Sequence, residues 1–262
     1  MGVFVKELST LYRVFSLGQS NPLPALPCSF GDFAAWQHAH VNGERLLAQQ
    51  AYWREQLKGA PDCLLLPTDR PRPESQDYAG AMVPVRLDRA LTHGLRILGQ
   101  RHGATLFMTL LTSWSMLMAR LSNQDDVVIG TPFAGRTQTA VEDLIGMFVN
   151  TQAQRVDLSG QPTTESLLQQ VKATTLAAQV NQDVPFDQVV EAVSPTRSLS
   201  YTPIFQVLFA LQNTPEMAFE LPGLTLSPLE TELTTAQFDL SLSLNEAGDP
   251  SRRISELCHG VV

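Results

Sequence analysis

Gly130 and Gly135, separated by four residues, lie in the stretch DVVIGTPFAGRT at residues 126–137. A phosphate-binding P-loop reads G-x-x-x-x-G-K-[ST], because successive backbone N–H groups and a Lys must reach the phosphates. Arg136 stands where that Lys would be, and Pro132 removes one backbone donor from the loop. Since short glycine motifs often match by chance, the stretch favours a turn after a buried strand over a nucleotide-binding loop.

The histidines show no spacing typical of catalysis. The chain has five of them, His38, His40, His93, His102 and His259. A hydrolase triad needs a nucleophile beside a His and an acid, and no G-x-S-x-G turn supplies an activated Ser. His40 and Glu44 could mimic two metal ligands on one helix face, but no third ligand is spaced to complete the site. A helix surface is favoured for this pair, and His102 before Gly103 is expected at a helix end.

The carboxylates and cysteines indicate no site either. Glu142 and Asp143 adjoin a turn, while Asp183 is expected to cap a helix that carries Asp187 on its surface. The three cysteines are far apart and contain no C-x-x-C pair: Cys28, Cys63 and Cys258. The residues alone therefore predict no catalytic group, no metal site and no directly bound cofactor.

Composition limits the classes of partner. The chain has 262 residues, of which 44% are hydrophobic and 17% charged, so we expect a folded protein with a large buried core. Its formal net charge of -8 argues against nucleic acid, whose phosphates would be repelled. The apolar stretch 104–121 contains Arg120 and several Ser and Thr residues, which favours a core helix over a membrane span. The odd number of cysteines and the lack of a targeting signal favour the cytoplasm.

Hydrophobic periodicity predicts an α/β protein with a helix-rich beginning. Helices are expected over 3–17, 30–58, 88–103, 104–122, 163–182 and 183–193, with Gly43 bending the second. Strands are expected over 81–88, 126–133, 148–156, 204–213 and 238–246, after a strand-like run at 63–67. In the last strand Leu240, Leu242 and Leu244 share one face, so that face is packed and the other is polar.

Five sequence blocks together resemble the condensation domains of non-ribosomal peptide synthetases, in the chloramphenicol-acetyltransferase-like superfamily. The blocks are SFGDFAAWQ with AYWREQLKGAP, LLLPTDRPRP, VVIGTPFAGRT with EDLIGMFVNT, QDVPFDQVVEAVSPTRSLSYTPIFQVLFALQN, and TAQFDLSLSLNE. They follow the family's order over residues 1 to about 246, which is more specific than one short motif. The resemblance implies a two-layer mixed sheet with flanking helices. It also implies a complete or nearly complete second half and only a helical remnant of the first half.

The resemblance also implies a division of the chain and a function. Residues 1–66 would be the first-half remnant, 67–80 a Pro-rich connector, and 81–262 a second-half α/β subdomain truncated at its end. Family members join a carrier-protein-bound aminoacyl or peptidyl thioester to the amine of an acceptor aminoacyl group, in a tunnel between two halves. Both substrates arrive on phosphopantetheine arms. The expected partners are therefore carrier proteins, other synthetase modules and a complementing first half, without nucleic acid or membrane.

The family's key motif, H-H-x-x-x-D-G, has no counterpart here, because no two histidines are adjacent. Met1 matches a position just past that motif, and the tail at 249–262 resembles no family block. Asn181 replaces a His that often precedes QDVPF. We therefore expect a fragment that is inactive alone. The alternative is an interaction module that docks a carrier protein or a separately encoded first half.

Five polar residues at matched positions are expected near the tunnel wall: Asn150, Thr151, Gln212, Ser241 and Ser243. An alternative stays open for all of them, because polar residues at strand ends more often satisfy backbone groups than contact a substrate. The sequence does not decide between these two roles.

Overall fold

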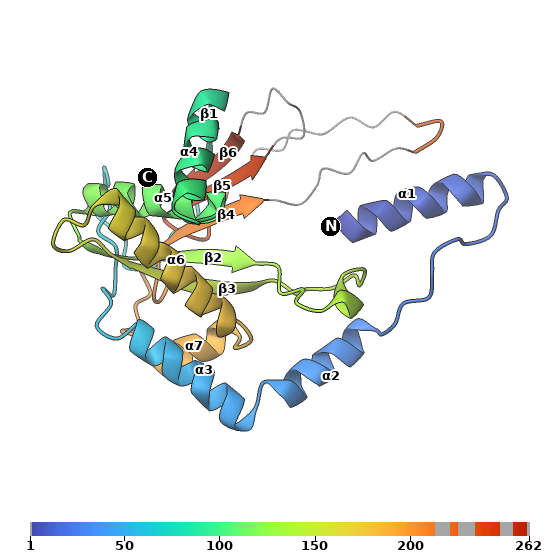
Figure 1. Cartoon of the computed structure of the whole chain (residues 1–262), viewed down its shortest axis with the longest axis horizontal. Coiled ribbons are helices and arrows are strands. Elements are labelled where there is room, and N and C mark those ends of the chain that lie inside the picture. Colours follow the sequence, from blue (N-terminus) through green and yellow to red (C-terminus); the bar gives the residue numbers. More distant parts are fainter. Residues whose placement is uncertain (1, 213–220, 225–233, 247–253, 261–262) are drawn as a thin grey trace.

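A mixed β-sheet organises the chain (Figure 1). The computed structural model describes residues 2–212, 221–224, 234–246 and 254–260, the last of these by its backbone alone. The strands are β1 (Ala81–Leu87), β2 (Asp126–Phe133), β3 (Asn150–Asp157), β4 (Val207–Gln212), β5 (Leu240–Glu246) and β6 (Ile254–Gly260). Their order is β1-β6-β5-β4-β2-β3, in which β4 is parallel to β2 and β5 and every other adjacent pair is antiparallel. The predicted mixed α/β architecture is confirmed.

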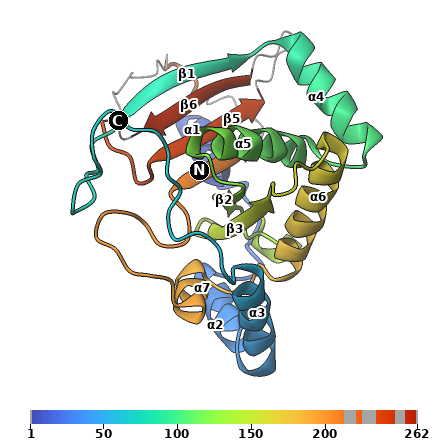
Figure 2. The ribbon, with the colours of Figure 1, turned by 90° about the vertical axis from the view of Figure 1, so that its left-hand side faces the viewer.

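Helices cover both faces of this sheet (Figure 2). They are α1 (Gly2–Ser16), α2 (Phe30–His40), α3 (Gly43–Gln56), α4 (Arg89–Arg101), α5 (Leu106–Ser122), α6 (Thr164–Val180) and α7 (Phe186–Val193). The alternation of β2 shows which helices lie on which face, because successive side chains point to opposite sides of a strand. Val127 and Ile129 pack with residues of α5 and α6, whereas Val128 packs with residues of α3 and α7. We call these the α5/α6 face and the α3/α7 face.

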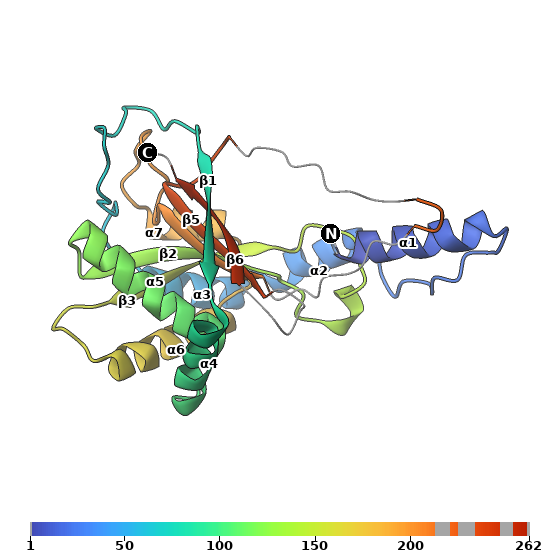
Figure 3. The same cartoon turned by 90° about the horizontal axis from the view of Figure 1, so that it is seen from above.

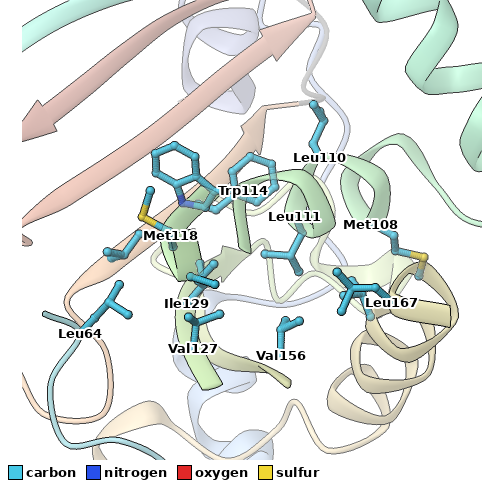
Figure 4. Packing of buried hydrophobic residues seen from close by; sticks show 14 of the residues in the cluster. Leu64, Met108, Leu110, Leu111, Trp114, Met118, Val127, Ile129, Val156 and Leu167 are labelled. Carbon is cyan, nitrogen blue, oxygen red and sulfur yellow. The ribbon is translucent and has the colours of Figure 1, made fainter. Parts of the chain in front are cut away.

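The main hydrophobic core lies on the α5/α6 face (Figure 4). Leu111 and Met118 of α5 are completely buried, as are Val127 and Ile129 of β2. Burying a side chain of this size contributes about 1.5–3 kcal/mol, so this cluster supplies much of the stability of the fold. The buried hydroxyls of α5 donate to carbonyls one turn earlier, for example Ser115 Oγ to the Leu111 carbonyl at 2.8 Å.

The prediction of a buried core helix over residues 104–121 is therefore confirmed by α5. Among the described residues, no single helix is long and apolar enough to cross a membrane. In that part of the chain, only α4 and α5 taken together have the length and apolar composition of a membrane span, and the two helices are bent by 106° relative to each other.

The first two helices form an arm that extends away from the sheet (Figures 1 and 3). α1 has no buried residue, and an exposed ion pair joins Lys6 to Asp143 at 3.9 Å. α2 begins at the predicted capping box, in which Ser29 and Asp32 exchange side-chain and backbone hydrogen bonds. Phe30 and Phe33 of α2 pack against Phe148: their ring centroids lie 5.2 and 4.6 Å, respectively, from the centroid of the Phe148 ring. These contacts fix α2 to the loop before β3.

The single long helix expected over residues 30–58 is wrong. One helix ends at His40 and a second begins at Gly43, the residue that was expected only to bend the helix. Gly43 has a φ of +52°, and Asn42 before it is extended, so the helical hydrogen bonds stop and α3 starts in a new direction. His40 and Glu44 consequently lie on two different helices. The interpretation that they share one helix face is also wrong.

Two further expectations are corrected by contacts between distant segments. The strand-like run at 63–67 forms no strand, because the backbone N–H of Leu64 donates to the side chain of Gln206 and takes no place in the sheet. The helix expected from residue 183 begins at Phe186, with Pro185 as its N-cap. Asp183 is not its cap, since side chains of α3 bind that carboxylate.

Candidate substrate groove

A groove of about 530 Å³ opens on the α3/α7 face, between α7 and strands β3 and β4. Thr151 contributes from β3, Phe186 from α7, Phe205 from the segment that leads into β4, Leu208 from β4 itself, and Phe238 from the segment before β5. This volume lies within the range of small-molecule sites, roughly 300–1,000 Å³. We call it the aromatic groove.

Three phenyl rings form a continuous wall of the aromatic groove. The ring centroids of Phe186 and Phe205 are 5.2 Å apart, and those of Phe205 and Phe238 are 5.3 Å apart. Phe205 is 2% exposed, and its ring lies where a Cβ atom on Gly130 would be. Gly130 is therefore needed because a larger residue would push the Phe205 ring out of place.

Asn150 fixes the start of α7 beside the groove. Its Nδ2 donates to the carbonyls of Gln182 and Val184 at 3.1 and 2.8 Å. Its Oδ1 accepts from the backbone N–H groups of Thr151 and Phe186 at 2.9 and 3.2 Å. The amide of Asn150 thus satisfies four backbone groups, which is the alternative role that the sequence left open. Through Phe186 it also sets the position of one aromatic wall residue.

α3 holds the same loop from the other side. Gln49 donates to the Asp183 carboxylate at 2.9 Å and accepts from the backbone N–H of Val184 at 3.2 Å. Arg45 pairs with Asp183 at 2.6 Å, and the buried indole of Trp53 donates to the Asn181 carbonyl at 2.9 Å. The loop before α7 is therefore held by side chains of both β3 and α3.

The Pro-rich stretch 67–80 fixes the far side of the groove. Arg72 donates two hydrogen bonds to the carboxylate of Asp239, the residue after Phe238. This hydrogen bonding raises the pKa of Arg72 above its ordinary value and outweighs the opposite effect of burial. Gln76 also donates to the backbone carbonyl of Gln237 at 2.9 Å. The segment that carries Phe238 is thus anchored by a distant part of the chain.

The five predicted wall residues are spread along one region of the sheet. Thr151 lines the aromatic groove, and Asn150 borders it. Ser241 is one strand beyond the groove, because its register partner in β4 is the wall residue Leu208. Ser243 follows on the same face of β5, while Gln212 is exposed at the end of β4. Their contact with a substrate remains a prediction.

The glycine motif forms the predicted turn, and its arginine is occupied. Arg136 donates to the carbonyls of Val141 and Glu142, and its guanidinium lies 4.1 Å from the centroid of the Phe148 ring. Gly135 has a φ of +66°, and a Cβ there would collide with the Phe148 carbonyl. The Gly-Arg pair thus stabilises the turn after β2, and the guanidinium faces carbonyl oxygens and a ring instead of an anion.

Two of the described histidines, His40 and His102, have local structural contacts. His40 stacks on Trp36 with centroids 4.5 Å apart. His102 is the C-cap of α4, as predicted, and its Nδ1 lies 3.6 Å from the Glu165 carboxylate. Within the described part of the chain, no group of three His, Cys, Asp or Glu residues could hold a metal ion.

Sequence reasoning missed the carboxylates at the rim of the groove. Asp187 and Glu191 both line it from α7. Their spacing of four residues places them on one side of a helix, and this was the available signal. This spacing indicates a binding site only when the three phenyl rings are known to lie next to α7. The sequence does not show that, because the rings come from three separate segments.

Comparisons with known proteins give the family and agree with the fold. The family model described as Condensation domain matches residues 1–252. Malpinin synthetase from Mortierella alpina is 51% identical over 246 residues, which are 94% of this chain and 3% of that protein. The solved X-domain from teicoplanin biosynthesis has a TM-score of 0.87 at 28% identity, over 98% of this chain and 60% of that one. The first condensation domain of the CDA synthetase has a TM-score of 0.76 at 17% identity, over 99% and 55% of the two chains.

Proposed function

The chain belongs to the condensation domain family, and from this premise we propose that it forms the end of the first half and most of the second half of an amide-forming domain. The reaction would join an aminoacyl or peptidyl thioester to the amine of an acceptor aminoacyl group. Both substrates would arrive on phosphopantetheine arms of carrier proteins. The family match over residues 1–252 is the observation that carries this proposal, and a relative from Salinispora arenicola described as a probable non-canonical nonribosomal peptide synthetase supports it, at 43% identity over 94% of this chain and 3% of that protein.

The residues of this chain would bind and orient the substrates. Amide formation needs the amine held about 3–3.5 Å from the thioester carbonyl, and fixed walls supply much of the acceleration by removing motion. Thr151 would contact a substrate directly, Asn150 would hold the wall, and Gln212, Ser241 and Ser243 would extend it along the sheet. No two histidines are adjacent in the sequence, so the imidazole of an H-H-x-x-x-D-G motif would have to come from a complementing first half.

A reconstitution assay tests this proposal. The chain is mixed with loaded donor and acceptor carrier proteins, with and without a first half that carries H-H-x-x-x-D-G, and the product on the acceptor carrier protein is measured by mass spectrometry. We expect product only when the first half is present. The control is the same first half with the second His of its motif changed to Ala. Product from this chain alone, at the rate of an intact domain, would contradict the proposal.

A second candidate function, an interaction module without turnover of its own, is favoured by α1. Phe4, Leu8 and Phe15 are 46%, 39% and 55% exposed, on a helix that buries none of its residues. Phe4 and Leu8 are one turn apart, so they form an apolar face of the kind that marks interaction sites. The expected partner is a carrier protein or a separately encoded first half.

Binding without chemistry separates the two candidates. The affinity of the chain for a first half and for a carrier protein is measured by anisotropy, and the double variant Phe4→Ser/Leu8→Ser is compared with Lys6→Gln on the same helix. An interaction module predicts that the double variant loses binding and Lys6→Gln keeps it, with no product in the reconstitution assay. Equal binding by both variants would exclude α1 as the docking surface.

A further inference from the structure

The aromatic groove has a one-sided charge. Asp187 and Glu191 lie on exposed positions of α7, and they are the charged side chains among the residues that line the groove. Neither carboxylate has a hydrogen bond or an ion pair with another described side chain. The other lining residues are apolar, aromatic or neutral polar, so the groove has a negatively charged rim whose two carboxylates have no partner among the described side chains.

The two carboxylates act on α7 in opposite ways. Like charges four residues apart destabilise an isolated helix by about 0.2–0.5 kcal/mol, whereas Asp187 in the first turn of α7 is stabilised by the positive end of the helix dipole by about 0.3–1 kcal/mol. Asp183, in the loop just before α7, is instead paired with Arg45 at 2.6 Å. Of the three acidic groups of this segment, the two at the rim are therefore those that have no cationic side chain beside them among the described residues.

The rings strengthen the preference for positive charge. The face of a phenyl ring carries partial negative charge and attracts cations, and this attraction grows when water is excluded. Phe186 and Phe205 both line the groove, and Phe186 is adjacent in sequence to Asp187. Among the described residues that line the groove there is no Lys, Arg or His, so the charged side chains of the lining attract a cation and repel an anion.

We propose that the aromatic groove binds an apolar group that carries a protonated amine. The apolar body lies against Phe186, Phe205 and Phe238, and the ammonium group lies at the rim near Asp187 and Glu191. Arylalkylamines and branched aliphatic amines are the simplest members of this class. The inference concerns binding alone and does not depend on the amide-forming reaction.

Three small probes separate the parts of this proposal. 2-Phenylethylamine has the ring and the cation, 3-phenylpropionate has the ring with an anion, and ethylamine has the cation without a ring. Each is titrated into the full chain, and binding is followed by amide chemical shifts. We expect 2-phenylethylamine to bind with a Kd of roughly millimolar order, as usual for ligands of this size, and the other two to bind at least about tenfold more weakly.

Isosteric variants identify the charges that matter. Asp187→Asn and Glu191→Gln are at exposed positions, so both should fold, which thermal unfolding checks directly. Each change should weaken 2-phenylethylamine binding roughly two- to fivefold, and the double variant should weaken it about tenfold. Glu165→Gln, on α6, is the matched control and should leave the Kd unchanged. Added salt should weaken binding to the unchanged chain and have little effect on the double variant.

Three results would overturn the proposal. If 3-phenylpropionate binds as well as 2-phenylethylamine, or if the double variant keeps its affinity, the groove does not select cations. If neither ring-bearing probe gives saturable shifts at groove residues, the groove is not a binding site. None of these results affects the reconstitution assay, so failure of this inference and failure of the proposed function can be distinguished.

Discussion

Both faces of the sheet carry an apolar cluster, but they differ in the hydrogen bonds that accompany it. On the α5/α6 face, apolar side chains of α5, α6 and β2 form one cluster, and the buried hydroxyls of α5 bond within their own helix. On the α3/α7 face, amide and carboxylate side chains reach between segments far apart in the sequence. Gln49 of α3, for instance, donates to the Asp183 carboxylate and accepts from the backbone N–H groups of Asp183 and Val184.

The difference follows from what each face has to do. Apolar packing is non-directional, so it can stabilise a sheet without fixing any single loop. Hydrogen bonds are directional and hold particular backbone groups at particular places. A groove needs fixed walls and an open space, and the α3/α7 face has both. We therefore expect the first face to determine stability and the second to determine the shape of the groove.

Leu111→Ala should give the largest effect on stability. Leu111 is 0% exposed at the centre of the α5/α6 cluster, and such a truncation costs about 2–5 kcal/mol through lost burial and the cavity that remains. Urea unfolding at neutral pH measures the loss. In the fraction that is folded, the affinity for 2-phenylethylamine should not change, because the groove lies on the other face.

Leu117→Ala, on the same helix but 46% exposed, is the control and should cost less than about 1 kcal/mol. The separation of the two faces would be contradicted if Leu111→Ala changed the probe affinity as much as it changed the stability. It would also be contradicted if both leucines gave the same loss.

Asn150→Ala should give a smaller loss of stability and a larger change at the groove. The substitution removes partners from two carbonyls and two N–H groups, all of them in partly buried positions where water can replace some of the lost bonds, so we expect a total loss of about 1–3 kcal/mol. Because Phe186 loses one of its anchors, binding of 2-phenylethylamine should weaken severalfold. Urea unfolding and the probe titration measure the two effects in one preparation.

Asn150→Asp sharpens this experiment. It keeps an oxygen to accept from Thr151 and Phe186 but places negative charge against the carbonyls of Gln182 and Val184. It should therefore be no more stable than Asn150→Ala. Gln212→Ala, at an exposed strand end, should change stability by less than about 0.5 kcal/mol. An Asn150→Ala protein with full stability and unchanged affinity would show that the hydrogen bonds of Asn150 do not position the groove.

The sequence predicted those features that depend on local pattern. The periodicity of 104–122 and 126–133 gave a core helix and a buried strand, which α5 and β2 confirm. The ordered blocks gave the condensation family and its mixed α/β fold, which the family match and the solved structures confirm. The glycine motif gave a turn, which Gly135 and Arg136 confirm.

The features that the sequence did not predict depend on distant partners. Leu64 stays out of the sheet because Gln206 takes its N–H, and Asp183 is no cap because Arg45 and Gln49 bind it. β6 pairs with β1 and β5 although its segment resembled no family block. The aromatic groove was missed for the same reason, since its rings come from separate segments. No window of sequence contains these pairings.

The pH dependence of stability gives a third, smaller test through Tyr52 of α3. Its hydroxyl is buried without a hydrogen-bond partner, and burial raises the pKa of Tyr52 to about 12 from its ordinary value of 10.0. Between these values the unfolded chain loses the proton while the folded chain keeps it. Stability should therefore fall as pH rises from 10 towards 12, by about 1–2 kcal/mol once partial solvent screening is considered.

Tyr52→Phe isolates this contribution, because it removes both the titration and the unpaired hydroxyl. At neutral pH the variant should be as stable as the unchanged chain or more stable by up to about 1 kcal/mol. At pH 11 its advantage should be larger, as measured by urea unfolding at both values. Tyr78→Phe, at a side chain that is 56% exposed, is the control, because it shows how much stability is lost at pH 11 through the titration of other groups. If Tyr52→Phe and Tyr78→Phe lose equal stability at pH 11, the hydroxyl of Tyr52 is not desolvated, and the packing of α3 against the sheet is looser than the structure indicates.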